Sequence, residues 1–128
     1  LKLFSFLKKM GARLPTIISP HSYVSKHATL KEGTIVMHGA IINAGSYIGE
    51  NCIINSQALV EHDSVVGAHC HISTGVKVNG GSLIGNESFV GSGTVINEGV
   101  QVGEKSLIAS GSVVNKNLPA RTSFYRKT

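Results

Sequence analysis

The chain has 128 residues, of which 41% are hydrophobic and 15% are charged, with 15 glycines, no tryptophan and a formal net charge of +5. This length suits one domain with enough apolar residues for a core, and the shortage of aromatic residues favours thin, regularly turning strands over a globule packed around large rings. No apolar run approaches the roughly 20 residues that a membrane span needs, and the cluster at residues 3–7 is too short for a signal peptide, so we expect a soluble, cytoplasmic protein.

The positive charge is concentrated at the two ends of the chain. Eight of the 12 basic residues fall within residues 1–19 and 116–128, whereas the four lysines between these ends face all seven acidic residues. This distribution gives no support to a basic groove for nucleic acid. We interpret the basic ends as solvated tails, with contact to an anionic phosphate ligand as the alternative.

Residues 1–16 are expected to form a short amphipathic helix and a linker. Four apolar residues recur there at helical spacing, with lysines between them: Leu3, Phe6, Leu7 and Met10. Gly11 is a plausible stop for this helix. The helix could lie on a membrane surface or be the last helix of a preceding domain, and we favour the second because Leu1 is not an initiating methionine.

A six-residue repeat runs from Ile18 to Val114. Every sixth residue in this stretch is aliphatic, and the residue four positions after each of them is small, or valine in two cases. A period of six matches neither an α-helix nor a simple alternating strand. It fits a coil of short strands in which each face points one branched aliphatic and one small residue inward.

The turn residues indicate how many faces make one coil. When every third repeat is compared, one column has glycine in four successive members: Gly49, Gly67, Gly85 and Gly103. A second column has asparagine in four of five successive members, with Glu61 as the exception: Asn43, Glu61, Asn79, Asn97 and Asn115. Glycine and asparagine best tolerate left-handed turn conformations. Different columns that each recur at every third repeat therefore predict three faces per coil.

We accordingly predict an all-β fold over residues 17–117, a parallel β-helix shaped as a triangular prism of five to six coils stacked at about 4.8 Å. Cys52 and Cys70, which are three repeats apart, are then stacked core residues and not metal ligands. One outward column is apolar except for a histidine and predicts a partner surface: Ile17, Ile35, Ile53, His71, Phe89 and Leu107. Residues 118–128 leave the repeat as a tail or capping segment.

Glu61-His62-Asp63 breaks the turn that ends the second face. The corresponding turns of the neighbouring coils have asparagine first and glycine third, as in Asn43-Ala44-Gly45 and Asn79-Gly80-Gly81. Replacement of both turn formers by carboxylates around a histidine favours a chemical role. A histidine can take a proton from an attacking amine or hydroxyl, and a carboxylate can fix its tautomer. His62 is the candidate base and Asp63 its partner, whereas Glu61 either shares that role or shapes the turn; an exposed polar turn is the alternative.

His71 follows His62 by half a coil. The two histidines are therefore expected on opposite sides of one prism, and they can meet only across a boundary between two copies of the chain. A histidine that merely fills an interface is the alternative. The other histidines are expected to be solvated turn residues, and no metal site is expected.

Over about residues 15–118 the sequence resembles the hexapeptide-repeat acyltransferases, which have a left-handed parallel β-helix fold and usually work as trimers. The stretch from Ile54-Asn55-Ser56 through Val60-Glu61-His62-Asp63 to His71-Ile72-Ser73 is similar to the sialic acid O-acetyltransferase and UDP-amino-sugar N-acetyltransferase family. The resemblance implies that His62 is the general base and that Asp63, often a glutamate in the family, supports it. It also implies that His71 and backbone groups at Ser92 and Ser110 contact acetyl-CoA.

The resemblance implies an acetyltransferase that acts by direct transfer from acetyl-CoA to the amino group of a nucleotide-linked sugar, or to a sugar hydroxyl, within a homotrimer whose active sites lie between subunits. It also implies that residues 1–16 join the β-helix to an N-terminal nucleotide-sugar domain. The alternative from another class is a non-catalytic trimerisation scaffold.

Overall fold

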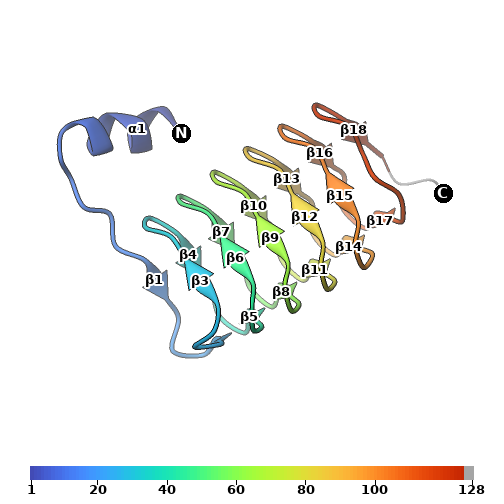
Figure 1. Cartoon of the computed structure of the whole chain (residues 1–128), viewed down its shortest axis with the longest axis horizontal. Helices are drawn as coiled ribbons and strands as arrows, with labels where there is room; N and C mark the ends of the chain where they lie inside the picture. The colour runs from blue at the N-terminus through green and yellow to red at the C-terminus, as the bar shows by residue number, and fades with distance from the viewer. Residues whose placement is uncertain (126–128) are drawn as a thin grey trace.

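The computed structural model describes residues 1–125, which form one helix followed by a ladder of short strands (Figure 1). Each strand has two residues and pairs in parallel with the strands of the neighbouring coils. Ile54, for example, is in register with Val36 on one side and with Ile72 on the other, three repeats away in each direction. The six-residue period with three faces per coil is therefore confirmed.

Within the described residues, eighteen strands fall into three sheets, which we call faces A, B and C, and together they make about six coils. Face A contains β1 (Ile17–Ile18), β4 (Ile35–Val36), β7 (Ile53–Ile54), β10 (His71–Ile72), β13 (Phe89–Val90), β16 (Leu107–Ile108) and β18 (Ser123–Phe124). Face B contains β2 (Tyr23–Val24), β5 (Ile41–Ile42), β8 (Leu59–Val60), β11 (Lys77–Val78), β14 (Val95–Ile96) and β17 (Val113–Val114). Face C contains β3 (Thr29–Leu30), β6 (Tyr47–Ile48), β9 (Val65–Val66), β12 (Leu83–Ile84) and β15 (Gln101–Val102).

The second residue of each strand points into the prism and forms the core. From Val36 to Val114 these aliphatic residues are at most 1% exposed, and the small residues four positions later are buried with them. Cys52 and Cys70 belong to this second set, and each thiol donates a hydrogen bond to a glycine carbonyl of the next coil, at 2.9 and 3.1 Å. Ile18, in contrast, is 46% exposed, because it lies at the N-terminal end of the stack.

The corners follow an equally strict rule, because every sixth residue from Gly33 to Gly111 has a positive φ, between 54° and 78°. The A–B corner, which follows face A, has Gly39, Gln57, Gly75, Gly93 and Gly111 at this position. The B–C corner has Gly45, Asp63, Gly81 and Gly99. The C–A corner has Gly33, Asn51, His69, Glu87 and Lys105.

Helix α1 (Lys2–Lys9) packs against the C–A corner at the N-terminal end of the prism (Figure 1). Two lysines in its last turn suit the helix dipole, and Gly11, with a φ of 80°, follows its end as expected. The side chain that docks is Phe4, which is 7% exposed and meets the ring of His69 edge-on at 5.3 Å. Lys8 forms an ion pair with Glu32. Within residues 1–125 this is the one helix, and it has neither the length nor the hydropathy to cross a bilayer.

Three of the four residues of the predicted apolar stripe are turned outward, whereas the fourth, Leu7, is half-buried. Leu3, Phe6 and Met10 are 58–69% exposed, so the docking residue lies beside the stripe that the spacing indicated and not within it. At the other end of the prism, Leu118 is buried and bridges to Val102, and β18 pairs with β16. The described part of the expected tail, residues 118–125, therefore covers the last coil; residues 126–128 lie outside the described residues.

Candidate active site

Glu61-His62-Asp63 forms the B–C corner of the third coil, between β8 and β9. The peptide amide of Asp63 donates to the carbonyl of Ala44 in the preceding coil, and the amide of Gly81 in the following coil donates to the carbonyl of His62. Asp63 has a φ of 59° where the second, fourth and fifth coils place glycine at this corner. The turn thus keeps the backbone path of its neighbours and carries side chains that they lack.

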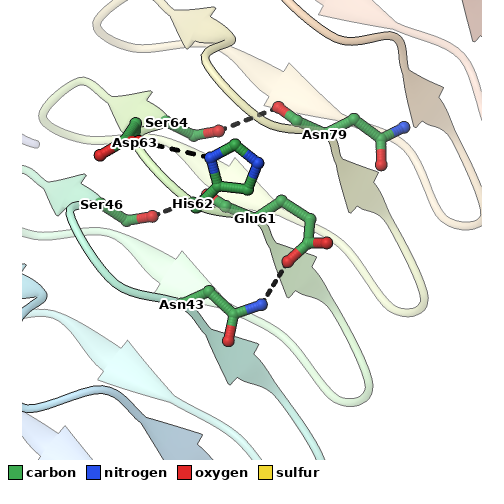
Figure 2. Close-up of polar contacts among 7 residues, drawn as sticks. All are labelled: Asn43, Ser46, Glu61, His62, Asp63, Ser64 and Asn79. Atoms are coloured by element: carbon green, nitrogen blue, oxygen red, sulfur yellow. Dashed lines mark hydrogen bonds and ion pairs between the residues drawn. The ribbon is translucent and has the colours of Figure 1, made fainter.

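His62 and Asp63 are in contact and both are open to solvent. Nδ1 of His62 lies 3.3 Å from Oδ2 of Asp63, and the two side chains are 64% and 73% exposed (Figure 2). Because an ionised carboxylate can only accept hydrogen bonds, this contact favours the tautomer with its proton on Nδ1. Nε2 is then left with a free lone pair, which is the state that a general base requires.

Two glycines make room for this pair. A Cβ atom at Gly80 would stand 2.7 Å from Nε2 of His62, so the imidazole occupies the space that a side chain would need, and Gly80 is buried beneath it. A Cβ atom at Gly45 would overlap Oδ1 of Asp63. The coils on either side of the pair therefore fix where it can lie, a requirement that the sequence columns alone did not reveal.

Glu61 points away from His62. Its carboxylate accepts a hydrogen bond from Nδ2 of Asn43 in the preceding coil, and its carbonyl accepts one from Oγ of Ser46 at 2.8 Å (Figure 2). Of the two roles considered from the sequence, shaping the turn is the one that these contacts favour.

His71 lies on face A, in β10, half-buried and edge-on to Phe89 at 5.1 Å. Oδ1 of Asn55 accepts a hydrogen bond from the amide of Ser56, so the Asn55 amide nitrogen faces Nε2 of His71, at 3.2 Å. Because that nitrogen can only donate, Nε2 of His71 accepts and the ring proton is on Nδ1. Burial lowers the pKa of His71, which agrees with a neutral ring.

Ser92 and Ser110 lie one above the other at the exposed A–B corner. Within residues 1–125 their peptide amides donate no hydrogen bond, whereas the carbonyl of Ser92 accepts one from the amide of Gly111 at 2.8 Å. The structure thus brings His62 and Asp63 together at the B–C corner and places His71, Ser92 and Ser110 on face A and the corner beside it. In a triangular prism the B–C corner lies opposite face A, so one chain does not unite the two groups.

Residues that the sequence reasoning did not single out include Asn43, Asn55 and Gly80, which hold or seat the histidines and Glu61. A further one, Gln57, could have been found from its column, since the A–B corners of the second, fourth, fifth and sixth coils have glycine there. Among the described residues, no three histidine, cysteine, aspartate or glutamate side chains gather as metal ligands.

Comparison with known proteins gives a consistent picture. Residues 27–116 match the family model of bacterial transferase hexapeptide repeats in three segments, 27–62, 45–80 and 81–116. A comparison with curated protein sequences gave no match.

Solved structures are similar over nearly the whole chain. The acetyltransferase domain of PglB from Neisseria gonorrhoeae FA1090, solved alone and with acetyl coenzyme A, is 32% identical with a TM-score of 0.91, covering 92% of this chain and 58% of that one. PerB from Caulobacter crescentus, solved with CoA and GDP-perosamine, is 38% identical with a TM-score of 0.91, covering 93% of this chain and 57% of that one.

A histidine-to-alanine variant of GDP-perosamine N-acetyl transferase from Caulobacter crescentus, in complex with the same two ligands, is 37% identical with a TM-score of 0.91 and covers 93% of this chain and 57% of that one. The present chain thus spans a little under three fifths of the length of these solved proteins.

Proposed function

The chain belongs to the bacterial hexapeptide-repeat transferases, and from this we propose that it transfers an acetyl group from acetyl-CoA to the amino group of a nucleotide-linked amino sugar. The observation that carries the proposal is the His62–Asp63 pair, which is exposed, seated between two glycines and oriented with Nε2 free. Support for the two substrates comes from the similar proteins solved with acetyl-CoA, CoA and GDP-perosamine. A sugar hydroxyl is the second candidate acceptor.

The proposed reaction is a direct transfer. The amine nitrogen attacks the thioester carbon of acetyl-CoA, and Nε2 of His62 accepts the proton that the nitrogen loses as the C–N bond forms. The C–S bond then breaks, and the proton returns from His62 to the sulfur, which gives the N-acetyl sugar and CoA. Asp63 stabilises the imidazolium that exists between these two proton transfers.

The developing oxyanion requires hydrogen-bond donors. We assign one of them to the peptide amide of Gly80, the residue over which the imidazole of His62 lies; within the described residues this amide donates to no acceptor. Its peptide is buried and held within the stack of coils, so the donor would need little rearrangement during the reaction.

We further propose that the cofactor lies along face A and the A–B corner, against His71, Ser92 and Ser110, and that His62 comes from a neighbouring copy in a homotrimer. The opposite placement of His62 and His71 supports a shared site. The apolar outward column of face A, which includes Phe89 and Leu107 at 39% and 46% exposed, supports contact between copies. We place the reaction in the cytoplasm, where buried thiols such as Cys52 stay reduced.

A thiol-release assay with acetyl-CoA and a panel of nucleotide amino sugars tests the proposal. His62→Ala should lower kcat by about 100-fold or more, the usual share of a general base. His27→Ala is the matched control, because His27 is exposed at the same B–C corner two coils earlier and should be dispensable. Undiminished turnover in His62→Ala would exclude the mechanism, and a trimeric wild type without turnover on any acceptor would favour a scaffold.

A further inference from the structure

The third coil departs from its neighbours at two corners and not only at the turn of His62. Gln57 is the one residue other than glycine at the positive-φ position of the A–B corner, with a φ of 60°, just as Asp63 is at the B–C corner. Both side chains are exposed, and both lie over the glycine of the preceding coil. Cγ of Gln57 is 3.2 Å from where a Cβ atom of Gly39 would stand.

Beyond Gln57, toward the C-terminus, the A–B corner is bare at its next two glycines. A Cβ atom at Gly75 or Gly93 would meet no heavy atom within 4 Å. We call the strip of Gly75 and Gly93, together with the amides of Ser92 and Ser110 beside it, which donate no hydrogen bond within residues 1–125, the glycine ledge. A slender chain could lie against the backbone here, and Gln57 is the first bulky residue at its N-terminal end.

The height of Gln57 along the prism follows from the stacking. His62 follows Gln57 by less than one third of a coil, so the two differ in height by less than about 2 Å for a rise of about 4.8 Å per coil. A cyclic trimer of parallel prisms places equivalent residues at equal heights. His62 of one copy is therefore level with Gln57 of the next, and the thioester that His62 serves must lie at the Gln57 end of the ledge.

On the basis of the proposed function, we infer that Gln57 closes the glycine ledge next to the thioester and thereby restricts the acyl donor to short acyl groups. An acyl chain that extends past the thioester toward the N-terminus meets the Gln57 side chain where it lies over Gly39. With glycine at position 57 the ledge would continue by one coil. That rise of about 4.8 Å is the length of three to four methylene groups.

The test compares acetyl-CoA with butanoyl-CoA in the full chain. Gln57→Gly should raise the ratio of kcat/KM for butanoyl-CoA to that for acetyl-CoA by about tenfold or more, the discrimination expected of a pocket that rejects additional methylenes. Gln57→Leu keeps the bulk without the amide and should keep the wild-type ratio. Lys105→Gly is the matched control, since it makes the same backbone replacement at the C–A corner and should leave the ratio unchanged.

Folding is not at risk in Gln57→Gly, because glycine with a positive φ already occupies this position in four other coils. An unchanged ratio in Gln57→Gly, or an equal rise in Lys105→Gly, would overturn the inference while leaving acetyl transfer intact. If the wild type shows no transfer, the proposed function fails, and calorimetric binding of the two thioesters then decides. If the wild type binds acetyl-CoA more tightly than butanoyl-CoA and Gln57→Gly removes this preference, the role of Gln57 is supported. If wild type and Gln57→Gly each bind the two thioesters with equal affinity, or bind neither thioester, the inference is overturned.

Discussion

Asp63 combines a left-handed backbone with a side chain that the same turn in other coils does not carry. For residues other than glycine that conformation costs roughly 1 kcal/mol, less for aspartate and asparagine than for most. Among residues 1–125, seven residues other than glycine bear this cost, and along the C–A corner it is common, so positive φ alone does not mark a functional residue. Asp63 is distinguished because the same position is glycine in the adjacent coils and because its carboxylate reaches His62.

Asp63→Gly should therefore separate stability from activity. We expect the unfolding free energy to rise by up to about 1 kcal/mol, because the strain is relieved, while kcat falls at least tenfold because His62 loses its orienting partner. Thermal unfolding and the thiol-release assay measure the two effects. Glu87→Gly at the C–A corner should give the same stabilisation with full activity. A stabilised Asp63→Gly that retains wild-type kcat would show that His62 needs no partner.

The lowered pKa of His71 gives a second prediction, on pH. Burial opposes protonation of the folded ring, so as pH falls below about 6.5 the unfolded chain takes up this proton first. The stabilising contribution is therefore complete above that pH and is lost as pH approaches the folded pKa. His71→Leu, which matches the aliphatic residues of its column, should show a smaller drop in unfolding temperature between about pH 7.5 and 5.5 than the wild type. His27→Ala should keep the wild-type drop, and an equal drop in His71→Leu would contradict the assignment.

At the scale of elements, the strands were predictable because each inward position repeats one requirement. A branched aliphatic must fill the space between two identical neighbours, and this is why the series from Val36 to Val114 has no exception. The break at Glu61-His62-Asp63 was visible against that background. The contacts that position the His62–Asp63 pair were not visible, because they join different coils: the side chains of His62 and Asp63 occupy space that Gly80 and Gly45 leave open. A comparison of residues at the same position in successive coils shows which residue differs, but it does not show which side chains that residue contacts.

Helix α1 was predictable as a helix but not in its orientation. Its spacing marked Leu3, Phe6, Leu7 and Met10 as one apolar stripe, yet Phe4 is the buried residue that docks, since the space over Gly33 accepts its ring. Such a choice between two faces depends on the shape of the receiving surface, which the sequence of an eight-residue helix does not encode.

Phe4→Ala should release α1 without unfolding the prism. Loss of this buried ring removes about 3 kcal/mol of docking energy, so amide hydrogen exchange in α1 should accelerate by about tenfold or more. The unfolding temperature of the prism should change little, because its core lies elsewhere. Phe6→Ala, which removes a 58% exposed ring from the same helix, should leave exchange unchanged. Equal effects of the two substitutions would contradict the docking role of Phe4.

At the scale of the whole molecule, the outward apolar column of face A is not unique. Ile41 on face B and Tyr47 and Leu83 on face C are 39–40% exposed, a degree similar to Phe89. Exposed apolar residues therefore do not select one contact face. It is the opposite placement of His62 and His71 that supports a site shared between copies.

A mixing experiment tests that sharing. His62→Ala and His71→Ala homotrimers should each have strongly reduced activity, whereas subunits unfolded together and refolded as mixed trimers should recover activity. At equal amounts, about one quarter of the sites would combine an intact His62 with an intact His71 of the next copy. Mixing either variant with itself is the control. Mixed trimers without recovery would place each active site within one chain.

Because strands three repeats apart pair with each other, the protein could be shortened or lengthened by whole coils. Each coil contacts only its neighbours, so deletion of one complete coil beyond Gly99 would rejoin equivalent surfaces and leave the strand register of the other coils unchanged. The His62–Asp63 turn would keep both of its glycine seats. What would change is the length of the glycine ledge beyond Gln57. The length of the ledge can therefore vary without a change in the geometry of the His62–Asp63 pair.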